Sequence, residues 1–384
     1  MRAFSFARIC CVRYNGVSFV ILVKLPVIHL ESSTDFNQLA EQIKVWGQDL
    51  GFAQVAIAPI DLEQAGKRLN AWLKRGYHGE MRYLAQHGSK RYRPAELLPG
   101  TVRVICVRMQ HWEGSDSAIK NLKSSDKAYI SRYARGRDYH KVMRKRLNQL
   151  AQRINATLPE HQYRAFVDSA PVMEKPLASA CGLGWQGKHT IVINPDEGSW
   201  FFLGCLFTNL PLPVDQPVAD RCGRCQACIK VCPTGAIKSP YVLDATRCIS
   251  YLTIEQKGSI PESLRRSIGN RIFGCDDCQL ICPWNRYAVS APAPEFTARE
   301  HLNEARLVDL FAWTETEFEE RTRGSAIRRT GYIGWLRNLA VALGNAPPSA
   351  EVKEALRLRL HHPSALVREH VIWALQEQRK KTIV

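Results

Sequence analysis

The sequence has no long hydrophobic run. Its most apolar stretch, residues 17–30 (VSFVILVKLPVIHL), is interrupted by Lys24 and Pro26, and no small-residue cleavage site follows it. A membrane-spanning helix needs roughly 18 or more apolar residues, and a secretory signal ends in a cleavage site. We therefore expect no membrane span. We interpret residues 1–30 as a disordered extension, which an over-long translation start would explain.

Acidic residues are scarce relative to basic ones. The 384 residues include 36 Asp and Glu against 53 Lys and Arg, which gives a net charge of +17. Such a surplus indicates a polyanionic partner, and nucleic acid is the commonest one. The alternative is a basic surface that serves only solubility, and charge by itself does not separate the two.

The thirteen cysteines are not distributed as in a disulfide scaffold. Disulfide-rich proteins are short and secreted, whereas this long chain places eight of its cysteines between positions 222 and 282. Clustered thiols in a long chain are typical of metal ligands in a reducing compartment. The apolar fraction is an ordinary 45%, so the chain can bury a core, and its length suits two or three domains.

Residue patterning predicts three domains after the extension. Residues 31–215 combine helical spacing at 35–51 and 140–154 with several short strand patterns, which predicts a mixed α/β (α+β) domain. Pro-rich segments at 211–220 and 290–296 flank a cysteine-rich domain, which we assign to 216–290. Residues 291–384 have helical patterning throughout and form the third predicted domain.

The C-terminal domain contains two similar segments. WLRNLAVALGN and REHVIWALQEQ resemble each other at an offset of 32 residues. The second follows a Pro-bounded turn, and helical spacing places Val367, Val371, Ile372 and Leu375 on one face. This pattern is typical of a HEAT-like repeat, although two copies are a weak signal because such arrays usually need three.

The cysteine spacing points to iron–sulfur clusters. Four cysteines follow C-x2-C-x2-C-x3-C and precede Pro233, which is the bacterial ferredoxin run. The second run lacks one cysteine because Ile272 occupies its place, and Cys248 is the obvious replacement. Structural zinc sites usually use two separated C-x2-C pairs instead. Because the last cysteine of a ferredoxin run ligates the other cluster, the predicted sets are Cys222, Cys225, Cys228 and Cys282 for one [4Fe–4S] cluster, and Cys232, Cys248, Cys275 and Cys278 for the other.

The remaining cysteines have no metal-like spacing. Cys106 and Cys205 lie in apolar strand patterns, where a cysteine is usually a small buried hydrophobic residue. The clusters transfer electrons one at a time, so the large N-terminal domain or a cofactor must supply the chemistry.

At this point the sequence resembles the epoxyqueuosine reductases over residues 34–345. The resemblance rests on the two cysteine runs and on long motifs in the same order: YHGEMRYLAQH, RPAELLPG, SRYARGRDYHKVMRKRL, FVDSAPVMEKPLA, GLGWQGKHT, RCISYLTIE, GNRIFGCDDCQLICPWNRY and GSAIRRTGYIGWLRNLAVALGNAP. It implies the reduction of epoxyqueuosine to queuosine at the wobble position of tRNA, the last step of queuosine biosynthesis. It also implies base-off cobalamin and two [4Fe–4S] clusters as cofactors.

The resemblance implies that Asp168, in the FVDSAP motif, donates the proton to the departing epoxide oxygen. A partly desolvated carboxylic acid near the corrin would keep its proton near neutral pH. The alternative is that Asp168 or Ser169 caps a helix, as Asp commonly does. Asp138 and His140 begin a string like the D-x-H-x-x-G motif that ligates cobalt, but Met143 replaces its glycine, so we do not assign His140 to cobalt.

Cobalamin contacts are also implied by the resemblance, at Arg93, Ser131, Asp168, Val192 and Leu203. Arg93 suits a propionamide or the nucleotide-loop phosphate, whereas Val192 and Leu203 could equally be plain core. The string Gly182 to Lys188 fits G-x-x-x-x-G-K, but the next residue is histidine rather than the Ser or Thr that would hold magnesium. We therefore exclude a P-loop.

A tRNA substrate needs a basic surface with aromatic side chains among the charges. The candidates fall in two groups: Arg328, Arg329, Tyr332, Trp335 and Arg337 near the repeat, and Arg132, Arg135, Lys141, Arg144, Lys145 and Arg146 before and within the predicted basic helix. Any one of them could instead be an ordinary solvated charge.

Two other functions compete with this interpretation. A corrinoid reductive dehalogenase uses the same redox logic on a small substrate, but such enzymes typically carry a twin-arginine export signal, which this sequence lacks. A plain ferredoxin-type electron carrier would not need the large first domain. We therefore predict a cytoplasmic, monomeric oxidoreductase that receives its electrons from an external donor.

Overall fold

The computed structural model describes residues 10–14, 17–21, 35–114, 117–290 and 293–383. The chain forms two compact units, 1–35 and 36–384. In the first unit, β1 (Cys10–Tyr14) pairs antiparallel with β2 (Val17–Ile21). The predicted disordered extension therefore contains a strand pair where it is described, and the rest of residues 1–30 lies outside the described residues.

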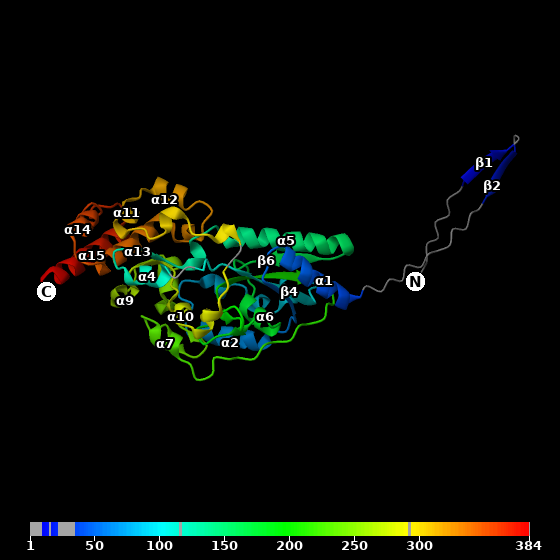
Figure 1. Cartoon of the computed structure of the whole chain (residues 1–384), viewed down its shortest axis with the longest axis horizontal. Helices are drawn as coiled ribbons and strands as arrows, with labels where there is room; N and C mark the ends of the chain where they lie inside the picture. The colour runs from blue at the N-terminus through cyan, green and yellow to red at the C-terminus, as the bar shows by residue number, and fades with distance from the viewer. Residues whose placement is uncertain (1–9, 15–16, 22–34, 115–116, 291–292, 384) are drawn as a thin grey trace. The chain divides into compact units, whose positions relative to one another are not determined.

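The second unit contains all the described helices and the remaining sheets (Figure 1). Its strands are β3 (Gln54–Ala58), β4 (Arg103–Gln110), β5 (Tyr129–Ile130), β6 (Tyr163–Phe166), β7 (Trp185–Gln186), β8 (Val192–Ile193), β9 (Phe201–Thr208), β10 (Ile237–Ser239), β11 (Val242–Leu243) and β12 (Arg271–Phe273). Its α-helices are α1 (Phe36–Asp49), α2 (Glu63–Lys74), α3 (Pro94–Leu97), α4 (Ser117–Lys123), α5 (Tyr139–Thr157), α6 (Glu174–Ala180), α7 (Ala227–Val231), α8 (Ile249–Ile254), α9 (Glu262–Ile268), α10 (Asp277–Leu280), α11 (Leu307–Ala312), α12 (Glu315–Arg321), α13 (Gly331–Asn345), α14 (Ala350–Arg357) and α15 (Ala365–Ile383).

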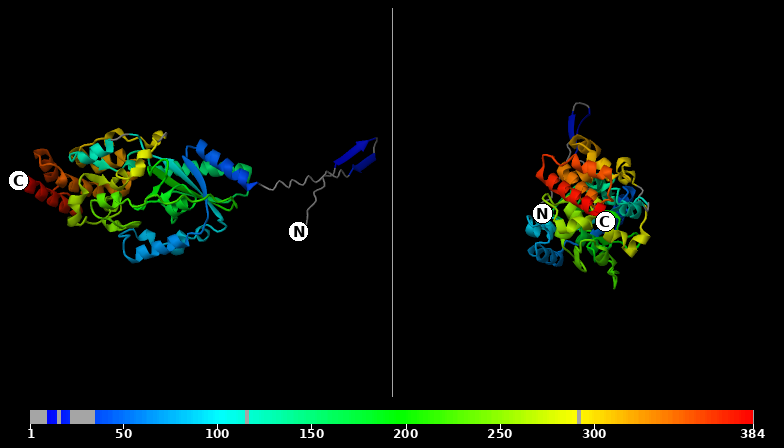
Figure 2. Two further views of the ribbon diagram at one scale, coloured as in Figure 1. Left: turned by 60° about the horizontal axis from the view of Figure 1, so that its bottom comes forward. Right: turned by 90° about the vertical axis from the view of Figure 1, so that its left-hand side faces the viewer.

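A four-stranded antiparallel sheet, in the order β3-β4-β9-β6, organises the N-terminal part. Alternate side chains along each strand reach opposite faces. Ile57 and Ile105 pack into a core with α1 and α5, whereas Val104 and Phe207 pack into a second core with α2 and α6. Figure 2 shows α1 on one side of this sheet and α2 on the other. The predicted mixed domain is confirmed in outline, with a sheet of the α+β kind.

The cysteine-rich segment is tied to the N-terminal part by a short parallel strand pair. Strand β12 pairs with β5 through Arg271 opposite Tyr129 and Phe273 opposite Ile130. Asp276, which follows β12, accepts hydrogen bonds from the hydroxyl of Tyr129 at 2.8 Å and the backbone N–H of Arg132 at 2.9 Å. These contacts hold Cys275, which follows β12, and Cys278 of α10 against the N-terminal part.

Helices α11 to α15 form the end of the unit farthest from α1 (Figure 1). Helix α13 is buried on most of its surface and packs against α15, where Gly344 lies close to Trp373. Val367 and Val371 of α15 are buried as predicted. The prediction for Ile372 is wrong, because this side chain is exposed: the buried face of α15 continues through Ala374 instead, which keeps the helical period.

Residues 36–384 form one compact unit, and the predicted boundaries within it, after residues 215 and 290, stay predictions. None of the helices in the described part of the chain is long and apolar enough to cross a membrane.

Candidate functional site

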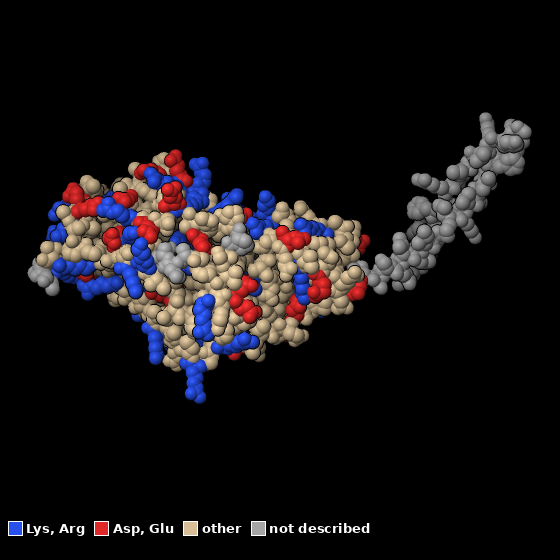
Figure 3. Space-filling model, viewed as in Figure 1, with Lys and Arg blue, Asp and Glu red and all other residues tan. Residues whose placement is uncertain are grey.

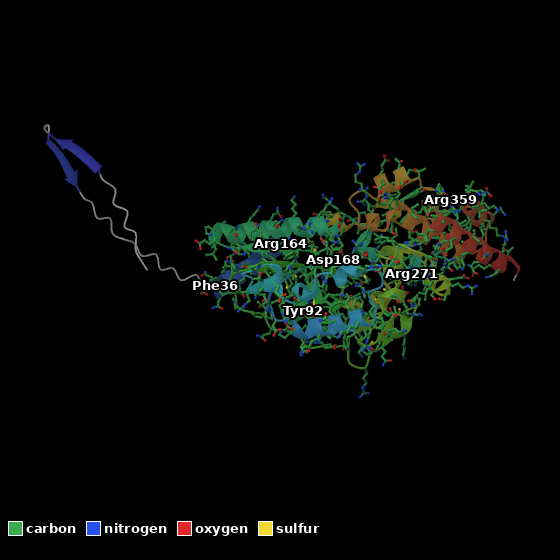
Figure 4. All side chains as sticks on the ribbon, turned by 180° about the vertical axis from the view of Figure 1, so that it is seen from behind. Phe36, Tyr92, Arg164, Asp168, Arg271 and Arg359 are labelled. Carbon is green, nitrogen blue, oxygen red and sulfur yellow. The ribbon has the colours of Figure 1, made fainter. Side chains whose placement is uncertain are left out.

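Asp168 follows β6, an outer strand of the main sheet. Its backbone has a φ of +53°, in the left-handed region that residues other than glycine rarely adopt. Conformations of this kind cost about 1–3 kcal/mol and gather at functional sites. The capping alternative is wrong, because α6 begins after Met173 and no side chain caps it. Figure 4 shows Asp168 near the middle of the second unit, between Arg164 and Arg271.

The start of α5 positions two side chains against Asp168 and a third against one of them. The Tyr139 hydroxyl donates to Asp168 Oδ2 at 2.5 Å, and His140 Nε2 lies 3.3 Å from the same oxygen. His140 Nδ1 lies 2.8 Å from Oδ1 of Asp138, the residue that caps α5. The Tyr139 ring stacks on Phe202 of β9 with centroids 4.1 Å apart. The helix start and the sheet therefore fix a chain of polar groups from Asp138 through His140 to Asp168.

These contacts decide where the proton resides. Burial lowers the pKa of His140, but its hydrogen bonds to Asp138 and Asp168 raise it more, to about 9. Burial works to raise the pKa of Asp168, but hydrogen bonds from His140 and Tyr139 outweigh burial and lower it. At neutral pH the proton is therefore on His140. The expectation that desolvation keeps a proton on Asp168 itself is wrong for this geometry.

The Asp168 side chain is accessible to solvent, although much protein surrounds it. Its side chain is 64% exposed, although burial contributes to its pKa. Lys175 is likewise exposed while burial lowers its pKa. Burial first, and then the charge of Asp168, raise the pKa of Glu174 to about 8. Solvent-open side chains in an enclosed position are what a large ligand site requires.

Several buried polar atoms beside this region lack a partner in the described part of the chain. They include Arg91 Nε, Glu174 Oε1 and Ser179 Oγ, and the charges of Arg91 and Glu174 act on each other. Buried polar groups are normally hydrogen-bonded. A ligand rich in amide donors and acceptors, such as a corrin with its propionamides, fits these unused groups.

A second site is formed by the cysteines. A cavity of about 180 Å³ is lined by Cys222, Cys225 and Cys228 of the first run together with Cys282 of the second. Trp185 Nε1 lies 3.5 Å from Cys222 Sγ, and Lys188 Nζ donates to the backbone carbonyl of Cys225 at 2.8 Å. Four thiols around one cavity suit a [4Fe–4S] cluster, and they are the four that spacing predicts for one cluster.

Three of the other four cysteines, Cys232, Cys248 and Cys278, are electrostatic neighbours. Burial and then the charge of Cys248 raise the pKa of Cys278, with Cys232 contributing as well. Cys275 Sγ donates to Asp277 Oδ2 at 2.8 Å. Cys248 is also an electrostatic neighbour of Lys175, which places this set on the side toward Asp168.

Comparison with known proteins matches two segments of the chain to described families. The family described as "Epoxyqueuosine reductase QueG, DUF1730" matches residues 91–169, and the "4Fe-4S double cluster binding domain" matches residues 221–285. The epoxyqueuosine reductase of Pseudomonas aeruginosa is 57% identical over 352 residues, covering 91% of this chain and 98% of that protein. The Escherichia coli enzyme is 54% identical over 345 residues, covering 90% of each chain.

The chain belongs to the epoxyqueuosine reductases. It is an oxidoreductase that acts on tRNA in the last step of queuosine biosynthesis. Solved structures of this family share its fold: a selenomethionine-labelled epoxyqueuosine reductase superposes with a TM-score of 0.83 at 28% identity, over 89% of this chain and 90% of that one. A second, with the same four values, was solved with an epoxyqueuosine-modified tRNA-Tyr stem loop.

A third structure, from Bacillus subtilis, has a TM-score of 0.81 at 27% identity over 89% of this chain and 90% of that one. It is described as having an aspartate-containing catalytic loop swung out of its active site. Membership of this family contradicts the two competing predictions, a reductive dehalogenase and a plain electron carrier.

The four other residues predicted to contact cobalamin lie in different environments. Arg93 is half-exposed and pairs with Glu63 at 2.6 Å and Glu96 at 3.0 Å. Ser131 is buried and donates its hydroxyl to Asp276 Oδ1 at 2.5 Å. Val192 is buried in the core on the α6 side of the sheet, and Leu203 packs partly buried against that core. Their roles as cobalamin contacts stay predictions.

Some of the predicted tRNA contacts are wrong. Trp335 and Arg337 are fully buried, and the Arg337 guanidinium donates to the backbone carbonyls of Leu252, Gln256 and Gly258. Tyr332, Arg132 and Arg135 are buried as well. The exposed candidates are Lys141, Arg144 and Lys145 on α5, Arg146 with a smaller exposed fraction, and Arg328 and Arg329 before α13.

The sequence did not indicate three residues of the Asp168 site, Tyr139, Glu174 and Lys175. It also did not indicate the contact of His140 with Asp168. The tripeptide of Asp138, Tyr139 and His140 resembles a cobalt-binding motif in the sequence, and this resemblance does not indicate its contact with Asp168. The signal for this group in the sequence is a capping aspartate followed by polar residues at the start of a helix.

We expect His140 to stabilise the fold in a pH-dependent way. Because its pKa is raised from 6.5 to about 9, its contribution is fully present below pH 6.5 and is lost as the pH rises through about 9. His140→Gln should lower the melting temperature by a few degrees at pH 6.5, and the difference from wild type should largely disappear at about pH 10. Thermal unfolding followed by circular dichroism across this pH range measures it.

His161→Gln is the matched control. Burial lowers the pKa of His161 to about 4, so this histidine is neutral throughout the range and its loss should destabilise equally at every pH. If His140→Gln lowered the melting temperature equally at both pH values, His140 would not be protonated at pH 6.5.

Proposed function

We propose that the chain reduces the epoxide of epoxyqueuosine with cobalamin and two [4Fe–4S] clusters, and that Asp168 delivers the proton to the departing oxygen. The observation that carries this proposal is the polar chain from Asp138 through protonated His140 to Asp168, on a strained loop open to solvent. Single-turnover assays of Asp168→Asn test it.

The residues of this chain handle the protons of the reaction. Converting the epoxide to the alkene consumes two electrons and two protons and releases water. When bound, cobalamin supplies a strong reductant or nucleophile, which the clusters recharge one electron at a time. His140 holds one proton 3.3 Å from Asp168 Oδ2, so a short transfer places it on the exposed carboxyl group. Tyr139 fixes the carboxyl orientation through its 2.5 Å hydrogen bond.

The proposed ligand sets are those that the spacing predicts. Cys222, Cys225, Cys228 and Cys282 would hold one cluster, and the shared cavity supports this set. Cys232, Cys248, Cys275 and Cys278 would hold the other. The electrostatic effects of Cys232, Cys248 and Cys278 on one another's pKa support this set. The second set lies toward Lys175, so it is the one that passes electrons to the catalytic site.

Cobalamin would bind base-off in the solvent-open region beside Asp168. Glu174, Ser179 and Arg91 could hydrogen-bond to corrin propionamides through their unpartnered atoms. Arg93, Ser131, Val192 and Leu203 are proposed contacts by family resemblance. Of these, Arg93 would have to exchange its carboxylate partners for a phosphate or amide of the cofactor.

The tRNA would bind across α5 and the loop before α13. Arg144 donates to Ser169 Oγ at 3.2 Å, so the basic surface of α5 borders the Asp168 loop. Figure 3 shows Lys and Arg side chains over α5. Arg329 is also an electrostatic neighbour of Asp168. The family structure with a modified tRNA-Tyr stem loop supports such a substrate here. The last helices, α14 and α15, would extend this surface as a HEAT-like pair.

Charge reversal on α5 should weaken tRNA binding. Arg144→Glu with Lys145→Glu removes two phosphate contacts, so affinity should fall about tenfold or more at ~0.15 M salt, and the slope of log affinity against log salt should decrease by about 2. Filter binding of epoxyqueuosine-containing tRNA at several salt concentrations measures both. Lys67→Glu with Lys74→Glu on α2, on the opposite side of the sheet, is the matched control. Equal weakening by the control pair would contradict the proposed surface.

The enzyme would be a cytoplasmic monomer that receives electrons from an external donor. Its basic charge and its clustered thiols support this assignment.

A further inference from the structure

One of the two cysteine sets reaches the protein surface. Of the eight cysteines, all of which are described, only Cys225 is exposed. It lies on the rim of the cavity shared with Cys222, Cys228 and Cys282. The other set lies toward Lys175, as described above. Electrons from outside would therefore enter at Cys225.

The rim of this cavity is basic. Arg221 and Arg286 line the cavity, and Arg224 stands next to Cys225 in the same loop. All three are exposed, and in the described part of the chain none of them forms an ion pair with a carboxylate. Arg328 and Arg329 differ in this respect, since each pairs with a glutamate. The rim charges are thus available to a partner. Figure 3 shows basic side chains projecting below α7, where this loop lies.

Apolar side chains lie beside these charges. Ile281 and Tyr287 are both exposed, and the Arg286 guanidinium covers the Tyr287 ring at 4.7 Å. Apolar and aromatic side chains within a charged rim are typical of a protein interface, whereas a surface for a phosphate backbone relies on charge. The rim arginines with Ile281 and Tyr287 therefore favour a protein partner over tRNA. We call these five residues, Arg221, Arg224, Arg286, Ile281 and Tyr287, the entry surface.

We propose that the entry surface docks a small acidic one-electron carrier protein. The inference rests on the proposed cluster assignment and adds the place and kind of partner. In each encounter the reduced carrier loses one electron and the cluster at Cys225 gains it, and two encounters supply the two electrons that one epoxide consumes. Complementary charge would speed the encounter and orient the carrier, while a small interface would allow its release.

The experiment uses a plant-type [2Fe–2S] ferredoxin as the probe carrier and enzyme with both clusters assembled. Arg221→Glu with Arg286→Glu should weaken ferredoxin binding about tenfold or more and slow cluster reduction by reduced ferredoxin in parallel. Added salt should weaken wild-type binding by screening. Binding is measured by calorimetry, and reduction by stopped-flow bleaching of the cluster absorbance. Dithionite, which needs no docking, should reduce the variant as fast as wild type.

Arg144→Glu with Lys145→Glu is the reciprocal control: it should weaken tRNA binding and leave ferredoxin binding unchanged. If the entry-surface variant loses its cluster, Arg221→Gln with Arg286→Gln provides the same test with a smaller effect. Wild-type reduction by ferredoxin in the iron-replete variant, or an equal effect of both double variants, would overturn the proposal. Iron content separates the two failures, because wild-type protein without two clusters would contradict the cluster assignment itself.

Discussion

Asp168→Asn should lose about a hundred- to ten-thousand-fold in the rate of the chemical step. The substitution keeps the size of the side chain and a hydrogen-bonding group, but an amide cannot take the proton from His140 and deliver it. Cobalamin should still bind, and both clusters should still assemble. Single-turnover conversion of epoxyqueuosine-containing tRNA by chemically reduced enzyme gives the rate, and titrations give cofactor binding.

Ser169→Ala is the control on the same loop. Ser169 contacts Val167 and Arg144 rather than Asp168, so its loss should leave the rate within a few-fold of wild type. Near-wild-type turnover by Asp168→Asn would remove Asp168 from the proton path. Loss of activity together with loss of cobalamin would mean that Asp168 holds the corrin instead.

Cys248→Ala should halve the iron content. Wild-type protein purified without oxygen should carry about eight irons and eight sulfides, four of each in each cluster. Because Cys248 stands in for the missing cysteine of the second run, its loss should remove only the cluster of Cys232, Cys275 and Cys278. Iron and sulfide analysis with electron paramagnetic resonance of the reduced protein measures the remaining cluster.

Cys205→Ala is the matched control. Cys205 is buried in the sheet opposite Cys106, outside both ligand sets, so the variant should keep about eight irons. Cys282→Ala tests the crossover from the other side, since it should spare the cluster that Cys248→Ala destroys. Retention of both clusters by Cys248→Ala, or loss of both, would contradict the assignment.

Local patterns predicted several elements correctly. The predicted strands at 54–59 and 102–109 are β3 and β4, and the basic helix at 140–154 is α5. The two strands are short apolar runs and the helix has helical spacing, and both kinds of pattern are local properties of the sequence. Ile372 shows the limit of this approach, because an apolar residue at the border of a helical face can lie on either side of it.

Burial of charged and aromatic residues could not be predicted in this way. Arg337 is a residue type that commonly contacts tRNA. Its guanidinium instead donates to three backbone carbonyls, one in α8 and two in the segment after it. Those carbonyls are about 80 residues away in the sequence. Trp335 likewise packs under Trp313 with ring centroids 5.6 Å apart.

The cluster chemistry and the choice of Asp168 as a candidate both follow from the sequence, because the spacing of thiols on a short loop and an unbroken motif are local in the chain. Only the tertiary structure decided the protonation of the site. His140 and Asp168 are 28 residues apart, and the pKa of each depends on a distance of 3.3 Å that the packing of α5 against β9 and β6 sets. Electrostatic interactions follow distance in space rather than distance along the chain.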